Sequence, residues 1–175
     1  LLLLKQAGYE IHLWNLCDGR CGTREHAPDV IAAMRWAEAQ NAARVAGAII
    51  HPPLFPDLDI WYNAESVARV GAVVREIAPD VVLTQPYHDY LEDHQNACRL
   101  VVAATFCRTV RNSLTIPPRP INDKPVALYH GMPHGLVTWD RTPVRPGCYV
   151  DISSVLAQKR EMLAQHRSQK EWLDV

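Results

Sequence analysis

The sequence predicts an α/β protein built around a mostly parallel sheet. Over residues 1–110, short apolar runs that fit buried strands alternate with segments whose apolar residues recur at helical spacing. Strand–helix–strand units of this kind set their strands parallel and cover both faces of the sheet with helices. The chain has 175 residues, of which 48% are hydrophobic and 21% charged, as in ordinary globular proteins. We therefore predict a single α/β domain over residues 1–175, a Rossmann-like three-layer sandwich.

Each element follows from a local pattern in the chain. The predicted strands cover residues 9–16, 48–50, 80–84, 126–129 and 149–152. The predicted helices cover residues 28–46, 64–77, 94–110 and 153–165, and they follow a first helix capped by Gly8. Pro28 suits a first helical turn, and Asn63 can cap the helix after it.

Two regions depart from this regular alternation. Seven of the 13 prolines fall between Pro117 and Pro146, so we predict irregular structure over residues 111–146, before the final helix. A chain seldom starts in the last turns of a helix, so we expect that further residues precede Leu1. The chain stops at Val175 without a terminating signal, so we expect that it is cut there too.

Composition and charge exclude several classes of protein. The formal net charge is −1 and the lysines and arginines are scattered, which argues against a dedicated nucleic-acid binder. No apolar run approaches the ~20 residues of a membrane span. The five cysteines are odd in number and lack the spacing of a disulfide framework, so we expect a reducing, cytoplasmic location.

Chemistry-bearing side chains gather in the loop after the predicted strand 80–84. Residues 88–94 hold two histidines and three carboxylates, and ligands of parallel sheets bind at the carboxyl ends of the strands. Imidazole and carboxylate groups together suit zinc or a similar divalent ion. A solvated polar loop that caps a helix would have the same composition, and on composition alone this is the favoured interpretation.

A set of motifs in fixed order favours the metal site instead. The chain resembles the LmbE-like, or PIG-L, de-N-acetylase family. The matching segments are Pro79–Thr84, Asp89-Tyr90, Asp93-His94, Arg35 with Glu38 and Ala42-Ala43, Phe55-Pro56-Asp57, Tyr149–Ser153, Lys159 and His166–Gln169. The resemblance implies a zinc-dependent hydrolase that removes an N-acetyl group from an amino sugar or a related small N-acylated substrate. It also implies a possible homo-oligomer.

The same resemblance implies roles for individual residues. His94 closes the second motif of the family and corresponds to a zinc ligand. The other ligands and the general base belong to a His-Pro-Asp-Asp type motif, which we expect upstream of Leu1. Asp93 could orient His94 or a neighbouring imidazole, or simply cap a helix. Arg35 corresponds to a residue that approaches substrate, although a surface pair with Glu38 is equally compatible with the spacing.

One position departs from the family pattern. The family commonly has a histidine three residues before the metal ligand, where it stabilises the oxyanion or protonates the leaving amine, and this chain has Leu91. Leucine can do neither. We expect His130 or His134 to replace it, with His166 and His88 as further candidates, although one of the first two is better explained as loop structure.

Other interpretations remain open. A carbohydrate- or small-molecule-binding protein on the same fold would have lost catalysis at Leu91. A nucleotide-binding domain is disfavoured because no G-x-G-x-x-G run follows a strand. Trp61 and Tyr62 could stack on a sugar ring, but buried anchors of their loop are the favoured role. Asp18 is explained by an Asp-Gly turn, and a zinc site at Cys17 and Cys21 is disfavoured without a second cysteine pair.

Overall fold

The computed structural model describes residues 1–173 and divides the chain into two compact units. The first unit contains residues 1–59 and 148–175, and the second contains residues 60–147. Each unit contains one two-stranded parallel sheet and the helices that pack on it.

The first unit is built on the long helix α2 (Pro28–Ala46). Its sheet pairs β1 (His12–Trp14) with β2 (Ile49–His51) in parallel. Pro28 occupies the first turn of α2, and Gly47 ends that helix in the left-handed conformation, with φ of 61°. The remaining elements are α1 (Leu2–Gln6), η2 (Ser153–Val155), α5 (Leu156–Leu163), η3 (Arg167–Gln169) and α6 (Lys170–Leu173).

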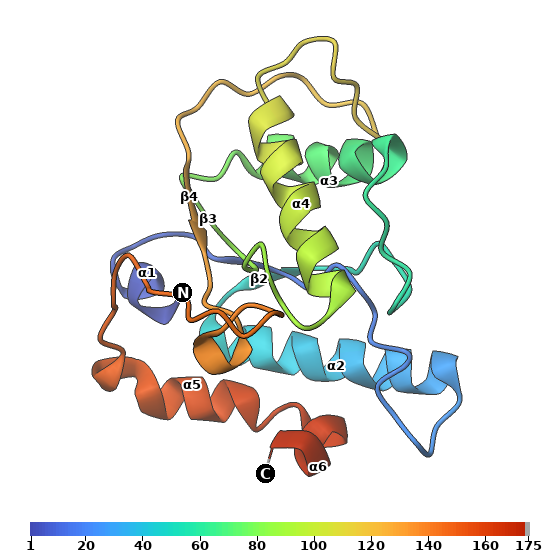
Figure 1. The fold of residues 1–175 in the computed structure, drawn as a ribbon, viewed down its shortest axis with the longest axis vertical. Helices are drawn as coiled ribbons and strands as arrows, with labels where there is room; N and C mark the ends of the chain where they lie inside the picture. The colour runs from blue at the N-terminus through green and yellow to red at the C-terminus, as the bar shows by residue number, and fades with distance from the viewer. Residues whose placement is uncertain (174–175) are drawn as a thin grey trace. The chain divides into compact units, whose positions relative to one another are not determined.

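The core of this unit lies along one side of α2. Its buried residues in that helix are Ile31, Ala39, Ala42, Ala43 and Ala46. The small alanine side chains let neighbouring elements approach closely, and α5 runs beside α2 (Figure 1). A separate small cluster packs Leu2 and Val155 against Ala46, so the two ends of the chain meet in one core.

The second unit pairs two helices above its sheet. The sheet joins β3 (Val81–Thr84) to β4 (Ala127–His130) in parallel. The helices α3 (Ala64–Ile77) and α4 (Glu92–Cys107) pack on each other (Figure 1). The side chain of Asn63 caps α3 by accepting a 2.8 Å hydrogen bond from the Ser66 N–H. A short turn, η1 (His134–Leu136), follows β4.

A buried arginine organises the proline-rich half of the second unit. Arg75 in α3 is 8% exposed, and its guanidinium donates hydrogen bonds of 2.9–3.2 Å to backbone carbonyls. The acceptors are the carbonyls of Cys107, Arg108, Val110, Ser113 and Arg119. Since these groups lie at the end of α4 and in the segment after it, one side chain satisfies backbone that has no helix or sheet partner.

The structure confirms most of the predicted elements and corrects others. The helices at 28–46 and 64–77 and the parallel pairing of the strands are confirmed. The first strand is shorter than predicted, with three residues instead of the span 9–16. The two units hold separate two-stranded sheets, and the three-layer sandwich remains a prediction.

The predicted strand at 149–152 is wrong. Tyr149 and Val150 are 87% and 67% exposed, and no strand is formed over these residues. The Asp151 carboxylate accepts hydrogen bonds from the backbone N–H and hydroxyl of Ser153, which turns the chain into η2. The β-branched composition that favoured a strand had no neighbouring strand to pair with.

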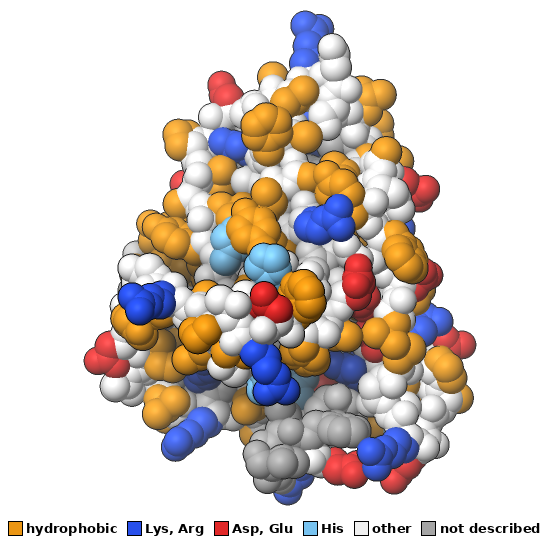
Figure 2. All heavy atoms as spheres, in the orientation of Figure 1, with side chains coloured by type: hydrophobic (Ala, Val, Ile, Leu, Met, Phe, Trp, Pro, Cys, Tyr) orange, Lys and Arg blue, Asp and Glu red, His pale blue; other side chains and the backbone are white. Residues whose placement is uncertain are grey.

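The surface agrees with the mixed composition. Figure 2 shows hydrophobic, cationic and acidic side chains interspersed on the face in view, without a large patch of one charge. Across residues 1–173, no helix combines the length and the apolar character that crossing a membrane requires.

Candidate metal-binding and catalytic site

The residues predicted to form the site are divided between the two units. Asp93, His94, His130 and His134 belong to the second unit, which also holds the loop before α4. Arg35 and His166 belong to the first unit.

His94 lies in the first turn of α4 and its ring is held by a carboxylate. The His94 Nδ1 atom is 3.0 Å from Asp89 Oδ1. Because a carboxylate can only accept, Nδ1 carries a proton, and in the neutral ring Nε2 presents its lone pair. The Asp89 side chain is 5% exposed and that of His94 is 34% exposed. The imidazole is therefore fixed in one tautomer while part of it remains accessible, as in a metal-ligating histidine oriented by a carboxylate.

Asp89 also fixes the loop around it. Its Oδ1 atom accepts a 3.2 Å hydrogen bond from the Leu91 N–H, and its carbonyl accepts a 2.9 Å bond from the Gln95 side chain. The loop thus turns into α4 with Leu91 at the N-cap position, where no side chain caps the helix. Asp93, predicted to orient His94, is 7% exposed in the first turn of α4. Within this unit the Asp89 carboxylate contacts the His94 ring.

Tyr90 connects His94 with one of the predicted proton donors. Its ring makes edge contacts with the rings of His94 and His134, with centroid separations of 5.6 and 5.8 Å. Tyr90 is 71% exposed and His134 is exposed in η1. The structure therefore brings His134 and His94 into contact with the same accessible aromatic ring.

His130 ends β4 and has a defined tautomer as well. Its Nδ1 atom is 2.9 Å from the Gln85 carbonyl and 3.5 Å from Cys98 Sγ. A carbonyl only accepts, so Nδ1 carries the proton and Nε2 is the basic nitrogen. Burial raises the pKa of the Cys98 thiol, which favours its neutral form beside this ring. The Tyr87 ring lies 4.2 Å from the His130 ring, centroid to centroid.

The aromatic pair in the segment before α3 is accessible. Trp61 and Tyr62 are 59% and 45% exposed, so the prediction that they are buried anchors is wrong. The Arg99 guanidinium lies 4.6 Å from the Tyr62 ring centroid, a cation–π distance. Because Trp61 is exposed, the alternative prediction, that its ring stacks on a sugar ring, remains a prediction.

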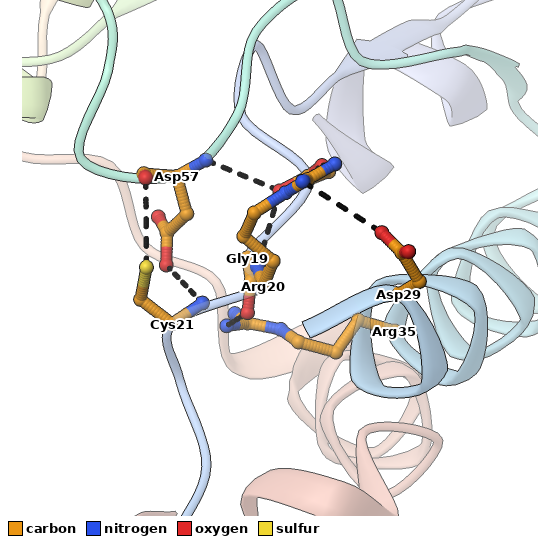
Figure 3. Close-up of polar contacts among 7 residues, drawn as sticks. Gly19, Arg20, Cys21, Asp29, Arg35 and Asp57 are labelled. Atoms are coloured by element: carbon orange, nitrogen blue, oxygen red, sulfur yellow. Dashed lines mark hydrogen bonds and ion pairs between the residues drawn. The ribbon is translucent and has the colours of Figure 1, made fainter. Parts of the chain in front are cut away.

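In the first unit, the loop after β1 is organised by Asp18, whose partners Arg20 and Asp57 are labelled in Figure 3. The Asp18 Oδ1 atom accepts hydrogen bonds of 3.1 Å from the backbone N–H groups of Arg20 and Asp57. Its Oδ2 atom accepts from the Arg20 guanidinium at 2.7–2.8 Å. Asp57 in turn accepts from the Cys21 N–H at 3.2 Å. Asp18 therefore does more than start a turn, because it ties together two loops that are far apart in sequence.

The partners of Asp18 set its ionisation. Burial by itself would raise the pKa of this carboxyl. The hydrogen bonds from Arg20 and from the Asp57 backbone, together with the charge of Arg20, outweigh burial and lower the pKa of Asp18 below its ordinary value. Asp18 is therefore a paired anion at neutral pH.

Arg35 lies against the same loop. Its guanidinium donates a 3.0 Å hydrogen bond to the Gly19 carbonyl, and a Cβ atom at Gly19 or Gly22 would collide with it. Glu38, the alternative partner of Arg35, accepts hydrogen bonds of 2.7 Å from the backbone N–H and hydroxyl of Ser168. The structure thus shows Arg35 in contact with a loop backbone, and its role towards substrate remains a prediction.

His166 lies beside this anchoring segment. It precedes η3, its backbone N–H donates to the Leu163 carbonyl at 3.1 Å, and its carbonyl accepts from the Gln169 N–H at 3.1 Å. The Gln169 side chain donates to the Gly22 carbonyl at 3.1 Å. The His166–Gln169 run therefore attaches η3 to α2 and to the loop after β1.

Sequence reasoning missed three participants in the second unit. Asp89 was part of the recognised motif but received no role, and Tyr87 and Tyr90 were not considered as ring partners of the histidines. The available signal was a carboxylate five residues before His94 with aromatic residues on either side of it. Spacing alone does not reveal which of three nearby carboxylates meets the imidazole.

One family profile matches this chain. The family profile described as "PIG-L: GlcNAc-PI de-N-acetylase" matches residues 1–105, which include Arg35, Asp89 and His94. No curated protein matches the chain by sequence.

Solved structures share the fold at 23% sequence identity. GalB, the 4-carboxy-2-hydroxymuconate hydratase from Pseudomonas putida KT2440, aligns with a TM-score of 0.78 over 97% of this chain and 72% of its own. The conserved protein TT1542 from Thermus thermophilus aligns with a TM-score of 0.74 over 96% of this chain and 70% of its own. The N,N'-diacetylchitobiose deacetylase from Pyrococcus horikoshii, complexed with its inhibitor MPG, also aligns with a TM-score of 0.74 over 96% of this chain. This chain spans 62% of that deacetylase.

Proposed function

The chain belongs to the PIG-L family of GlcNAc-PI de-N-acetylases, and we propose that it is a metal-dependent hydrolase that removes an N-acyl group from an amino sugar or a similar small molecule. Family membership supports a deacetylase-type hydrolase. The metal and the substrate class belong to the proposal, and Zn²⁺ is the ion that we expect.

The observation that carries the proposal is the orientation of His94 by Asp89. The His94 Nδ1 proton is committed to a buried carboxylate, so Nε2 is the atom that can bind an ion. This donor chemistry fits zinc, and His94 would be one of its ligands. Zinc held by His94 would lower the pKa of a bound water to about 7 and would polarise the substrate carbonyl.

Histidines of the same unit would handle the leaving group. Amide hydrolysis needs a proton for the departing amine, and Leu91 cannot supply it. His134 is the better supported donor because Tyr90 contacts both its ring and that of His94. His130 is the second candidate, with Nε2 left basic by the Gln85 carbonyl. Asp93 would support the site from the first turn of α4.

A second candidate function is the addition of water to a carbon–carbon double bond. Such a reaction expels no amine, so it does not need the proton donor that is missing at Leu91. GalB, a hydratase by name, shares the fold. The same His94–Asp89 pair would serve either reaction, and only the substrate separates the two.

The experiment is a paired assay of the full-length protein. Zinc-loaded enzyme is incubated with N-acetylglucosamine and N,N'-diacetylchitobiose, and free amine is measured; hydration of unsaturated dicarboxylic acids is followed by absorbance. We expect amine release that is lost on chelation and in His94→Ala, but kept in His26→Ala, an exposed histidine in the loop before α2. Loss in both variants would point to a general effect of histidine removal and would contradict the proposal.

The proton donor is tested in the same assay. We expect His134→Ala to lower kcat by roughly 10²–10³-fold with unchanged zinc content, as when an oxyanion donor is removed. Introducing the family histidine as Leu91→His should restore part of this loss. Hydration without amine release would establish the second candidate, and zinc binding without either activity would establish a binding protein.

A further inference from the structure

A second pair of histidines lies in the first unit, outside the residues used above. His12 in β1 and His51 in β2 are on adjacent parallel strands, with His12 opposite Ile49 and Trp14 opposite His51. The His12 Nδ1 and His51 Nε2 atoms are 2.8 Å apart. The His12 Nε2 atom is 3.0 Å from Glu10 Oε1.

The contacts fix where the protons are. The Glu10 carboxylate accepts, so His12 carries a proton on Nε2 and, when neutral, offers a lone pair on Nδ1. His51 then donates from Nε2 to that lone pair. The two rings are 21° from parallel with centroids 5.1 Å apart, which places them nearly in one plane, end to end. Two nitrogens from separate strands thus face each other across a short gap.

We propose that this pair binds a divalent ion that prefers square-planar or tetragonal coordination, of the Cu²⁺ or Ni²⁺ class, through His12 Nδ1 and His51 Nε2. Two nitrogens at right angles about such an ion, each at about 2.0 Å, are about 2.8 Å apart. The observed separation is 2.8 Å. A tetrahedral ion would need about 3.3 Å, so the spacing favours the tetragonal class.

Binding requires one proton shift and a rotation of each ring by roughly 45°, because an ion bound at a right angle lies off the line that joins the two nitrogens. His51 moves its proton from Nε2 to Nδ1, so that both facing nitrogens present lone pairs, and the rings turn until these converge. His12 keeps its Nε2 proton and its hydrogen bond to Glu10. The carboxylate thereby orients the ligand ring and raises its basicity, as carboxylates do behind metal-bound histidines.

The pair lies on two hydrogen-bonded strands. Both ligands come from paired strands, which hold side chains more precisely than loops do. Trp14 lies next to the pair, with its ring centroid 6.0 Å from that of His51 and its indole N–H donating a 2.8 Å bond to the Pro52 carbonyl. A paramagnetic ion at this site would quench the fluorescence of Trp14.

The test is a titration of full-length, zinc-loaded protein with CuCl₂ in a non-coordinating buffer. Electron paramagnetic resonance should show nitrogen hyperfine structure from two imidazoles, and tryptophan fluorescence should fall with the same stoichiometry. The copper affinity should drop at least tenfold in His12→Ala and in His51→Ala. The Trp14→Phe variant should bind copper with most of the quenching lost.

Two control variants and one further test variant keep the result decisive. His26→Ala and His94→Ala should keep this copper signal, because neither residue belongs to the pair. Glu10→Gln should weaken copper binding by about 10–100-fold; its side chain is 72% exposed, so this variant is expected to fold. A two-nitrogen signal that survives in His12→Ala and in His51→Ala would overturn the proposal, as would the absence of such a signal in the wild-type protein.

Discussion

Two loops that follow strands of parallel pairs use their carboxylates in opposite ways. The loop after β1 in the first unit holds Asp18, whose oxygens are occupied by Arg20 and by backbone N–H groups. The loop after β3 in the second unit holds Asp89, which contacts an imidazole. The first carboxylate stabilises a loop, and the second selects a tautomer.

The difference shows that position at the end of a strand does not define function. Both loops lie at carboxyl ends of parallel strands, where ligands bind in such sheets. The partner of each carboxylate determines its role. The Arg20 guanidinium and two backbone N–H groups occupy the oxygens of Asp18. The His94 ring donates to Asp89 through Nδ1, which leaves its Nε2 atom as the acceptor. The exposed rings of Tyr87 and Tyr90 line the second loop, which suits it to contact a ligand.

The largest expected effect is on the structural loop. Replacing Asp18 with Ala removes charge-assisted hydrogen bonds and leaves Arg20 without its nearer partner, so we expect the free energy of unfolding to fall by about 2–3 kcal/mol. Urea unfolding at pH 7 measures this change. Asp29→Ala is the matched control, because Asp29 is 94% exposed and 3.7 Å from Arg20. Equal effects in the two variants would contradict the role assigned to Asp18.

The same carboxylate predicts a pH dependence. The pKa of Asp18 is lowered by folding, so its stabilising effect is present above the unfolded-state value of about 3.9 and is lost as pH falls through the lower folded-state value. The difference in stability between wild type and Asp18→Ala should therefore be constant near neutral pH and shrink below about pH 4. Unfolding curves across this range check the prediction, and a difference that grows in acid would refute it.

The next effect is on the imidazole loop. Asp89→Asn removes the charge behind His94, and we expect zinc affinity to weaken by about 10–100-fold with a smaller change in stability. Competition with a chromogenic chelator measures the affinity. Glu92→Gln, which removes an exposed carboxylate at the first residue of α4, should leave the zinc affinity unchanged. An equal loss of zinc affinity in both variants would contradict the role assigned to Asp89.

The smallest effect concerns the backbone beneath Arg35. Gly19 has φ of 72° and no space for a Cβ beside the guanidinium, so Gly19→Ala should cost about 1 kcal/mol of stability or more. Gly8→Ala has the same backbone requirement, with φ of 94°, but open space around it. Thermal unfolding of the two variants separates backbone strain from the collision with Arg35; a Gly8→Ala variant as unstable as Gly19→Ala would exclude the collision.

Local signals in the sequence were sufficient to predict most of the helices. Pro28 and Asn63 mark helix starts because their roles depend on neighbouring backbone alone. The strands were less predictable, because a strand exists only where another strand pairs with it. Residues 149–152 have strand composition but are exposed, and residues 9–16 pair over His12–Trp14 alone.

The candidate site was predictable as a region but not as a set of contacts. The motif located His94, yet its ring meets Asp89, five residues earlier, while Asp93 is adjacent in sequence. On a helix, consecutive side chains point in different directions, so adjacency in sequence does not tell which carboxylate meets a ring. The Asp18 cluster and the His12–His51 pair bring together residues almost forty positions apart, and only tertiary structure reveals them.

The most direct test of the account is the zinc content of His94→Ala. Full-length wild-type and variant proteins are loaded with zinc, passed over a desalting column and analysed by elemental mass spectrometry, with circular dichroism to establish that both are folded. We expect that the wild type retains zinc, that His26→Ala does so equally, and that His94→Ala loses zinc together with amine release. A folded His94→Ala variant that retains wild-type zinc would show that the imidazole held by Asp89 is not a metal ligand.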